Sequence, residues 1–252
     1  MDADDLELFA RSVRGAVGAD DVDAALADLG WVEAMADEPE AAISVLFSLQ
    51  GEAGARSRAL HLVVGADALP LGPTWVRLGG EGRPIGGVDP ALGLVEVDAV
   101  EGWAGDLRLG QIALGHELVG ASRTMLALAR THALEREQFG QPIAQFQAVR
   151  HRLAEALVAI ETAEAMLEAA WLDGTPVTAA MAKALAGRGA RTVARHCQQV
   201  LAGIGFTTEH DLHRFVRRTL VLDQLLGSAR SLTKSLGDDL IATRTLPPLL
   251  PL

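Results

Sequence analysis

The stretch ALEREQFGQPIAQFQAVRHRLAE, residues 133–155, is a polar break between two long segments of helical apolar periodicity, and it decides the fold of this chain. Apolar residues recur every three or four positions on both sides of the break, which predicts one amphipathic helix before it and another after it. We predict that the first helix ends near Glu135 and that the second begins at Pro142, because a proline at the first helical position leaves no N–H unsatisfied.

A basic and an aromatic residue, Arg136 and Phe139, lie at this predicted helix–turn–helix corner. A guanidinium held there can make paired hydrogen bonds to a phosphate or a carboxylate, and a ring beside it can stack on a planar ligand. The structural alternative makes Phe139 a core anchor and pairs Arg136 with Glu135 or Glu137. The residues alone leave both interpretations open.

Composition and charge limit the class of protein. The chain has 252 residues, of which 49% are hydrophobic, enough to bury a substantial core. Residues 1–105 carry 6 Lys and Arg against 19 Asp and Glu, whereas residues 106–252 carry 16 against 14, and the net charge is −11. No basic face accumulates, so we do not expect nucleic acid as a partner.

Targeting, membrane and metal signals are weak. The acidic start MDADDLELFA does not match a signal peptide, and no apolar run is long enough for a bilayer, so we expect a cytoplasmic protein without a membrane partner. The single cysteine, Cys197, cannot form an intrachain disulfide, and we interpret it as a small buried hydrophobe. His210 and His213 lack an evident third ligand, so no metal is expected.

Three parts follow one another along the chain. Residues 1–58 predict short helices, with Asp20 or Asp21 as an N-cap and Trp31 as a packing anchor. Residues 59–103 predict a reduced β region of three or four short strands in LHLVVGADALPL, TWVRLGG and LGLVEVDAV. The GGEG segment at 79–82 lacks the Lys-Ser/Thr of a phosphate loop and is interpreted as a hairpin loop.

Residues 104–252 predict an antiparallel helix bundle with an extended PPLLPL tail. Its third helix would span 177–201, Thr207 or Thr208 would cap the fourth, and a last helix would run over 225–241. An alanine-rich stripe on the third helix is expected to face the core. It consists of Ala179, Ala182, Ala186 and Ala190.

Two stretches of this bundle, residues 133–155 and QVLAGIGFTTEHDLHRFVRR at 199–218, resemble the C-terminal domain of acyl-CoA dehydrogenases, flavoenzymes that desaturate acyl-CoA thioesters. The resemblance covers residues 104–240, and the N-terminal half follows the family only in outline. It implies a mainly α, acyl-CoA dehydrogenase-like fold with short N-terminal helices, a reduced β segment and an antiparallel bundle.

The resemblance implies FAD as cofactor and assigns residues to its nucleotide end. The matching positions are Arg136, Gln138, Phe139, Gln147, Gln199 and Gly203. Arg136 would meet the pyrophosphate across a subunit interface, and Gln199 with the turn at 203–205 would approach the adenosine, where glycine permits close backbone approach.

The family's catalytic glutamate has no counterpart at the matching positions. Leu226 occupies the step where the family places this base, and Gly110 matches the position on the first bundle helix that some members use. Neither side chain accepts a proton. Glu117, further along that helix, is an alternative base, although we expect it to cap or pair within the bundle.

The residues that would cover the flavin ring also depart from the family's pattern. Residues 59–103 contain no Thr-Glu-Pro flavin loop, and Trp75 and Trp103 stand in different contexts from the family's tryptophan. We therefore interpret the chain as a subunit of a heteromeric (α2β2-type) acyl-CoA dehydrogenase, inactive alone. A full-length acyl-CoA dehydrogenase subunit would supply the glutamate, a bulky steroid-derived acyl-CoA would be the substrate, and an electron acceptor would reoxidise the flavin. The alternatives are a homo-oligomeric flavoenzyme with a displaced base and a non-catalytic scaffold that binds no flavin.

Overall fold

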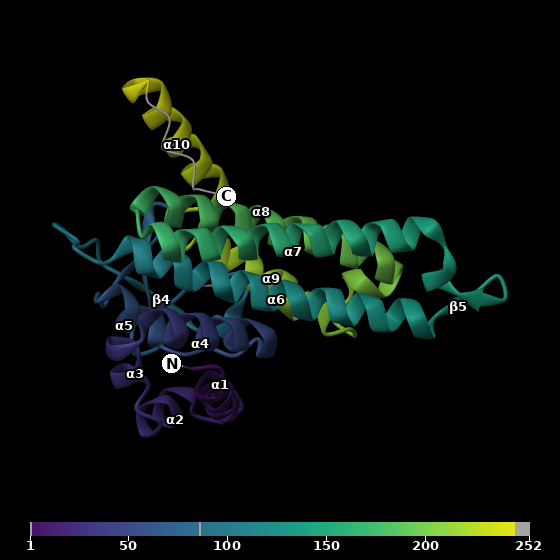
Figure 1. Cartoon of the computed structure of the whole chain (residues 1–252), viewed down its shortest axis with the longest axis horizontal. Coiled ribbons are helices and arrows are strands. Elements are labelled where there is room, and N and C mark those ends of the chain that lie inside the picture. The colour runs from purple at the N-terminus through teal and green to yellow at the C-terminus, as the bar shows by residue number, and fades with distance from the viewer. Residues whose placement is uncertain (1, 86, 245–252) are drawn as a thin grey trace.

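The computed structural model describes residues 2–85 and 87–244, and helices dominate it (Figure 1). The helices are α1 Ala3–Val17, α2 Val22–Asp28, α3 Trp31–Asp37, α4 Pro39–Ala53, α5 Ala59–Val64, α6 Leu107–Glu135, α7 Gln147–Asp173, α8 Pro176–Leu201, α9 Leu212–Gln224 and α10 Ala229–Thr243. The strands are β1 Leu69–Leu71, β2 Thr74–Leu78, β3 Arg83–Pro84, β4 Leu94–Val97, β5 Glu137–Gln138 and β6 Gln141–Pro142, and the 3₁₀ turns are η1 Pro90–Leu92, η2 Ile143–Gln145 and η3 Ala202–Phe206. Within the described residues, none of the helices combines the length and the hydropathy needed to cross a membrane.

The N-terminal helices form as the sequence predicts. Asp21 caps α2, since its side chain accepts a hydrogen bond from the backbone N–H of Ala24. Trp31 is 1% exposed and its Nε1 donates to the carbonyl of Ala42, which confirms its role as a packing anchor.

The reduced β region is an antiparallel sheet in the order β1-β2-β4-β3. The prediction of three or four strands is confirmed, but the LHLVV run forms helix α5, because Leu60, Val63 and Val64 bury their side chains there. Residues 79–82 are not a hairpin loop: they join β2 to β3, which both pair with β4 and not with each other. The Arg77 side chain holds this loop through the carbonyls of Gly79 and Glu81.

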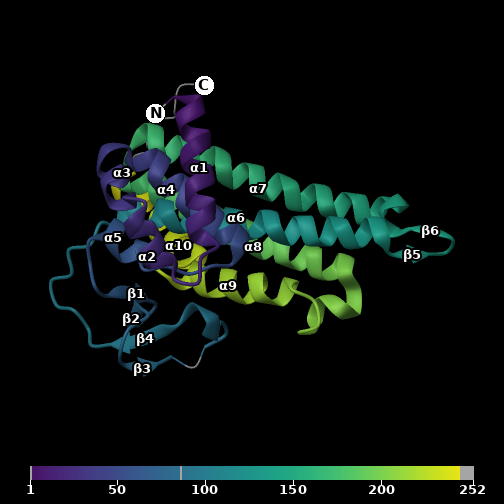
Figure 2. The same cartoon turned by 90° about the horizontal axis from the view of Figure 1, so that it is seen from below.

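The long helices α6, α7 and α8 lie side by side, with α7 antiparallel to the other two, and α9 packs against α6 and α8 (Figures 1 and 2). The alanine-rich stripe of α8 is at most 2% exposed and lies in the core as expected. Helices α4 and α6 cross with their backbones in contact: a Cβ placed on Gly51 would lie 2.1 Å from the carbonyl oxygen of Glu117, and one on Gly120 2.1 Å from that of Ser48.

Three predicted boundaries in the bundle are wrong. The second bundle helix begins at Gln147 and not at Pro142, because residues 137–142 form the β5–β6 hairpin and Pro142 pairs with Glu137. Helix α9 begins at Leu212, and Thr207 does not cap it because its hydroxyl instead donates to the carbonyl of Ile204.

The last helix also starts later than predicted. It begins at Ala229, with the Ser228 hydroxyl accepting from the N–H of Ser231, because Leu225 pairs with Leu71 of the sheet and ends α9. The predicted PPLLPL tail lies outside the described residues.

Candidate functional site

The β5–β6 hairpin projects beyond the ends of α6 and α7 (Figures 1 and 2). Its two loop residues, Phe139 and Gly140, have φ values of 55° and 77°, the left-handed pair of a type I′ turn, which favours asparagine and glycine. Phe139 is 93% exposed, and its ring makes a T-shaped contact with that of Phe146, at a centroid distance of 6.2 Å. The core-anchor alternative for Phe139 is therefore wrong.

Arg136 lies at the base of this hairpin and is exposed. Its backbone ends α6 and joins the hairpin, since its N–H donates to His132 and its carbonyl accepts from Ile143. Among the described residues its guanidinium has no carboxylate partner, so the predicted alternative of an ion pair with a neighbouring glutamate is not observed. Gln138 is exposed too, and its amide donates to the Glu137 carbonyl at 2.6 Å.

The second predicted segment lies at the same end of the bundle. Gln199 is exposed on the last turn of α8, and a Cβ on Gly203 would meet no atom within 4 Å, so the space beside it is open. Ala202, just before it, has a φ of 53°. Burial, and then the charge of His210, lower the pKa of His132 at the end of α6. Gln147 is also exposed here, in the first turn of α7.

The two positions that the resemblance names for the base touch each other. Leu226 is 2% exposed, and a Cβ on Gly110 would lie 2.5 Å from its Cδ1 and 2.7 Å from Cγ2 of Val64. The backbone N–H of Leu226 donates to the Pro70 carbonyl, and its own carbonyl accepts from Gln111 Nε2 at 3.0 Å. Apolar atoms therefore fill the place where a carboxylate would stand.

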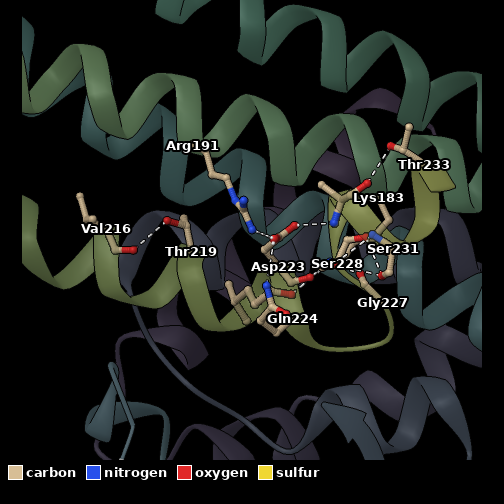
Figure 3. Close-up of polar contacts among 12 residues, drawn as sticks. Lys183, Arg191, Val216, Thr219, Asp223, Gln224, Gly227, Ser228, Ser231 and Thr233 are labelled. Atoms are coloured by element: carbon tan, nitrogen blue, oxygen red, sulfur yellow. Dashed lines mark hydrogen bonds and ion pairs between the residues drawn. The ribbon is translucent and has the colours of Figure 1, made fainter. Parts of the chain in front are cut away.

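A buried lysine that the sequence analysis did not single out holds this turn (Figure 3). Lys183 of α8 is fully buried, and its Nζ donates to the carbonyls of Leu222, Asp223 and Gly227 at 3.1–3.3 Å. Burial lowers the pKa of Lys183 to about 8. The Asp223 carboxylate accepts from Arg191 and from the backbone N–H of Ala229. In the sequence, the position of Lys183 inside the apolar run AMAKALA indicates that this lysine is buried and needs hydrogen-bond partners.

Glu117 lies in a buried ion cluster between the bundle and the N-terminal half. It is 2% exposed, and its Oε1 lies 3.6 Å from Nη1 of Arg218, whose Nε donates to Asp89. Burial raises the pKa of Glu117, and the charge of Arg218 opposes this effect. Oε1 accepts no hydrogen bond from the described residues. The expectation that Glu117 pairs within the bundle is confirmed.

The remaining candidates have structural roles. Trp103 donates to the Ala68 carbonyl and packs against Trp75, with ring centroids 6.0 Å apart. Cys197 is buried, which raises the pKa of its thiol to about 12 and confirms the interpretation as a small hydrophobe. Nδ1 of His210 accepts from the N–H of Leu212, and Nδ1 of His213 contacts the His210 carbonyl.

Residues 103–240, more than half of the chain, match the family model described as the acyl-CoA dehydrogenase C-terminal domain. The chain belongs to the acyl-CoA dehydrogenase family. The acyl-CoA dehydrogenase IpdE2 of Mycobacterium tuberculosis is 33% identical over 170 residues, which cover 66% of this chain and 53% of that relative. FadE34 of the same organism is 40% identical over 128 residues, 48% of this chain and 18% of its own length. The chain thus spans about half or less of these acyl-CoA dehydrogenases.

Solved structures share the fold of this acyl-CoA dehydrogenase family member over nearly its whole length. A chain of the Tcur3481–Tcur3483 steroid ACAD variant superposes with a TM-score of 0.71 at 21% identity, covering 96% of this chain and 98% of that one. A chain of the ChsE4–ChsE5 complex from Mycobacterium tuberculosis gives 0.67 at 18% identity, covering 98% of both chains. A glutaryl-coenzyme A dehydrogenase covers 68% of this chain but only 50% of its own, with a TM-score of 0.57 at 22% identity.

Proposed function

We propose that this chain is the subunit of a heteromeric FAD-dependent acyl-CoA dehydrogenase that completes the flavin site of a full-length partner subunit. The observation that carries the proposal is the β5–β6 hairpin. It extends beyond the bundle and exposes Phe139 in a strained conformation, and at its base lies Arg136, exposed and without a carboxylate partner among the described residues. In this proposal, Arg136 and Phe139 contact a flavin that the partner subunit holds.

The residues at this end of the bundle fit the nucleotide part of FAD. A guanidinium without a competing carboxylate suits a pyrophosphate, a free aromatic ring suits a stacked base, and an exposed amide suits an adenine edge. Arg136, Phe139 and Gln199 would take these roles, with the open backbone at Gly203 beside them. FAD supplies the hydride acceptor for desaturation of the acyl chain.

In this proposal the partner subunit removes the α-proton of the acyl-CoA substrate. Leu226 and Gly110 fill the base position of this chain with apolar atoms, and Glu117 is buried in an ion cluster with Arg218. A full-length acyl-CoA dehydrogenase subunit would contribute the glutamate, and an electron acceptor would reoxidise the flavin. The contribution of this chain is to hold the nucleotide end and to shape the wall beside it.

The full-length superpositions support a heteromeric assembly. Two solved chains described above superpose on this protein along 96% or more of its length. The names of their structures each give two components, Tcur3481–Tcur3483 and ChsE4–ChsE5, and the first is called a steroid ACAD. The glutaryl-coenzyme A dehydrogenase, by contrast, is covered only by half. Together with the abbreviated N-terminal helices, this favours a bulky, steroid-derived acyl-CoA as the substrate.

The test is the flavin content of the complex with a full-length acyl-CoA dehydrogenase produced beside this chain. Arg136→Ala should lower the visible flavin absorbance per complex at least about tenfold under dilution, since a charge-assisted pair to a phosphate is lost. Arg130→Ala is the matched control, because Arg130 is an exposed arginine on the same helix. Equal flavin content in both variants would refute the assignment.

The same experiment separates the alternatives. A colourless complex at full occupancy would identify a scaffold that binds no flavin. A yellow, active chain without a partner, inactivated by Glu117→Gln, would identify a homo-oligomeric enzyme with a displaced base.

A further inference from the structure

Three arginines near the start of α9 line a small cavity to which the β5–β6 hairpin contributes none of the described lining residues. Arg214, Arg217 and Arg218 form one wall of this cavity, whose volume is about 130 Å³, and Asp89 is the one carboxylate among the described residues around it. Three positive charges against one negative charge leave a net charge of +2 there, in a chain whose net charge is −11. We call this cavity the α9 pocket.

The positions of these arginines are unfavourable unless an anion lies among them. Arg217 and Arg218 lie three and four residues after Arg214, so the three side chains share one side of the helix, where like charges repel. They also lie in the first two turns of α9, where the helix macrodipole disfavours positive charge. An anion in the α9 pocket would relieve both effects.

The arginines have hydrogen-bond donors to spare. Arg214 pairs with Asp211 at 3.5 Å, but both side chains are more than half exposed, so this ion pair is weak. Arg217 is exposed and forms no hydrogen bond or ion pair with the residues that the structure describes. The Arg218 side chain is only 4% exposed, and its Nε and Nη1 have acceptors, whereas its Nη2 donates to none of the described residues. Several guanidinium groups with open donors suit the oxygens of a phosphate.

A larger cavity, of about 550 Å³, adjoins the α9 pocket. The two cavities share Gly54, Ala91 and Arg218 as lining residues. The larger volume lies within the range of about 300–1,000 Å³ that small-molecule sites occupy. Its charges balance, since three aspartates and three arginines line it, namely Asp20, Asp21, Asp23, Arg56, Arg58 and Arg218. Hydroxyl groups both donate and accept hydrogen bonds, so the hydroxyls of a sugar can pair with both kinds of side chain.

We propose that the two cavities together bind a sugar phosphate, with its phosphate in the α9 pocket and its sugar in the larger cavity. A phosphate monoester carries a charge of about −1.5 to −2 at pH 7, which matches the net charge of the α9 pocket. The residues involved differ from Arg136, Phe139 and Gln199, so the inference does not rest on the proposed flavin site.

Isothermal titration calorimetry of the full-length chain tests the proposal with ribose 5-phosphate, inorganic phosphate and ribose. We expect ribose 5-phosphate to bind at least about tenfold more tightly than inorganic phosphate, because the sugar adds contacts, and we expect no measurable binding of ribose alone. Adenosine 5′-monophosphate separates the two sources of this chemistry: tighter binding than ribose 5-phosphate identifies a nucleotide, and equal or weaker binding identifies a free sugar phosphate. Absence of binding by all the phosphate compounds, or equal binding of the dicarboxylate succinate, would overturn the proposal.

Variants locate the binding site. Arg217→Ala should weaken binding of ribose 5-phosphate at least about tenfold, and Arg217→Lys should lose less, because lysine keeps the charge but not the paired donors. Ala91→Glu, on the wall shared by both cavities, should weaken binding by a similar factor, because it adds a negative charge. Arg188→Ala is the control, since Arg188 is exposed on α8 and lines neither cavity.

Arg136→Ala separates this site from the proposed flavin site. Its affinity for ribose 5-phosphate should equal that of the parent chain, whatever its effect on flavin content. A loss in Arg136→Ala as large as that in Arg217→Ala would assign the binding to the flavin end of the bundle. That result, or parent affinity in a folded Arg217→Ala chain, would overturn the inference.

Discussion

Replacement of Arg218 by methionine tests whether the buried ion cluster joins the bundle to the N-terminal half. The Arg218 side chain is 4% exposed and comes from α9. Its Nε donates to Asp89 and its Nη1 to the Ala55 carbonyl, and it lies beside Glu117 of α6. Methionine is about as long as the aliphatic stem of arginine and keeps the apolar contacts of that stem, so the change removes the guanidinium with its charge and its hydrogen bonds.

The expected loss is about 3–5 kcal/mol of unfolding free energy, the range for removing one partner of a buried ion pair. Most of it comes from Asp89, whose side chain is 7% exposed and would lose the guanidinium that donates to it. Glu117 contributes less, because burial already raises its pKa and it can take up a proton once Arg218 is gone.

Urea denaturation at neutral pH, followed by circular dichroism, measures this loss as a lower midpoint with an unchanged slope. The double variant Arg218→Met/Asp89→Asn provides the control, since it removes the uncompensated charge and should recover roughly 2 kcal/mol of the loss. A single-variant loss below about 1 kcal/mol, or a double variant no more stable than the single one, would refute the reasoning.

Three further predictions concern other buried contacts. Nε2 of His116 accepts from Trp171 and contacts the Ser44 hydroxyl, and burial lowers its pKa from 6.5 to about 4. As pH falls, the imidazole is therefore protonated in the unfolded state before it is protonated in the folded state. The free energy of unfolding should fall by up to about 3 kcal/mol between pH 6.5 and pH 4, and His116→Gln should flatten this part of the stability–pH profile. Gly120→Ala should destabilise the chain by about 2 kcal/mol or more, because its Cβ would overlap the Ser48 carbonyl, whereas Gly15→Ala, with nothing within 4 Å, should not. Lys183→Met should cost about 2–4 kcal/mol in urea denaturation, since three buried carbonyls lose their donor.

The periodicity of apolar residues predicted most of the helices, and local interactions explain the segments where that prediction was wrong. The long helices and the alanine-rich stripe follow from apolar spacing because each buries one face. The LHLVV run shows the limit: its β-branched residues suit a strand, but contacts with the bundle make it helix α5. The hairpin at 137–142 was missed because a phenylalanine in a type I′ turn gives no turn signal.

The candidate site was predictable only where a resemblance named the residues. The outward positions of Arg136 and Gln199 agree with that expectation, but the contact of Leu226 with Gly110 joins residues more than a hundred positions apart. Nothing in either local sequence indicates that they meet. For Lys183 the apolar run around it indicated burial, but its three acceptors lie on α9 and in the turn after it, so the local sequence did not identify them.

Backbone strain links these separate observations. Among the described non-glycine residues, positive φ angles occur at Phe139, Ala202, Leu226 and Arg244, and the first three lie at or beside positions that the family resemblance names for ligand contact or catalysis. At Leu226 the strained turn is held by hydrogen bonds from Gln111 and to Pro70, and Lys183 binds the carbonyls around it. The strain at Leu226 is thus compensated by hydrogen bonds with α6, α8 and the sheet, and its buried side chain fills the space beside Gly110.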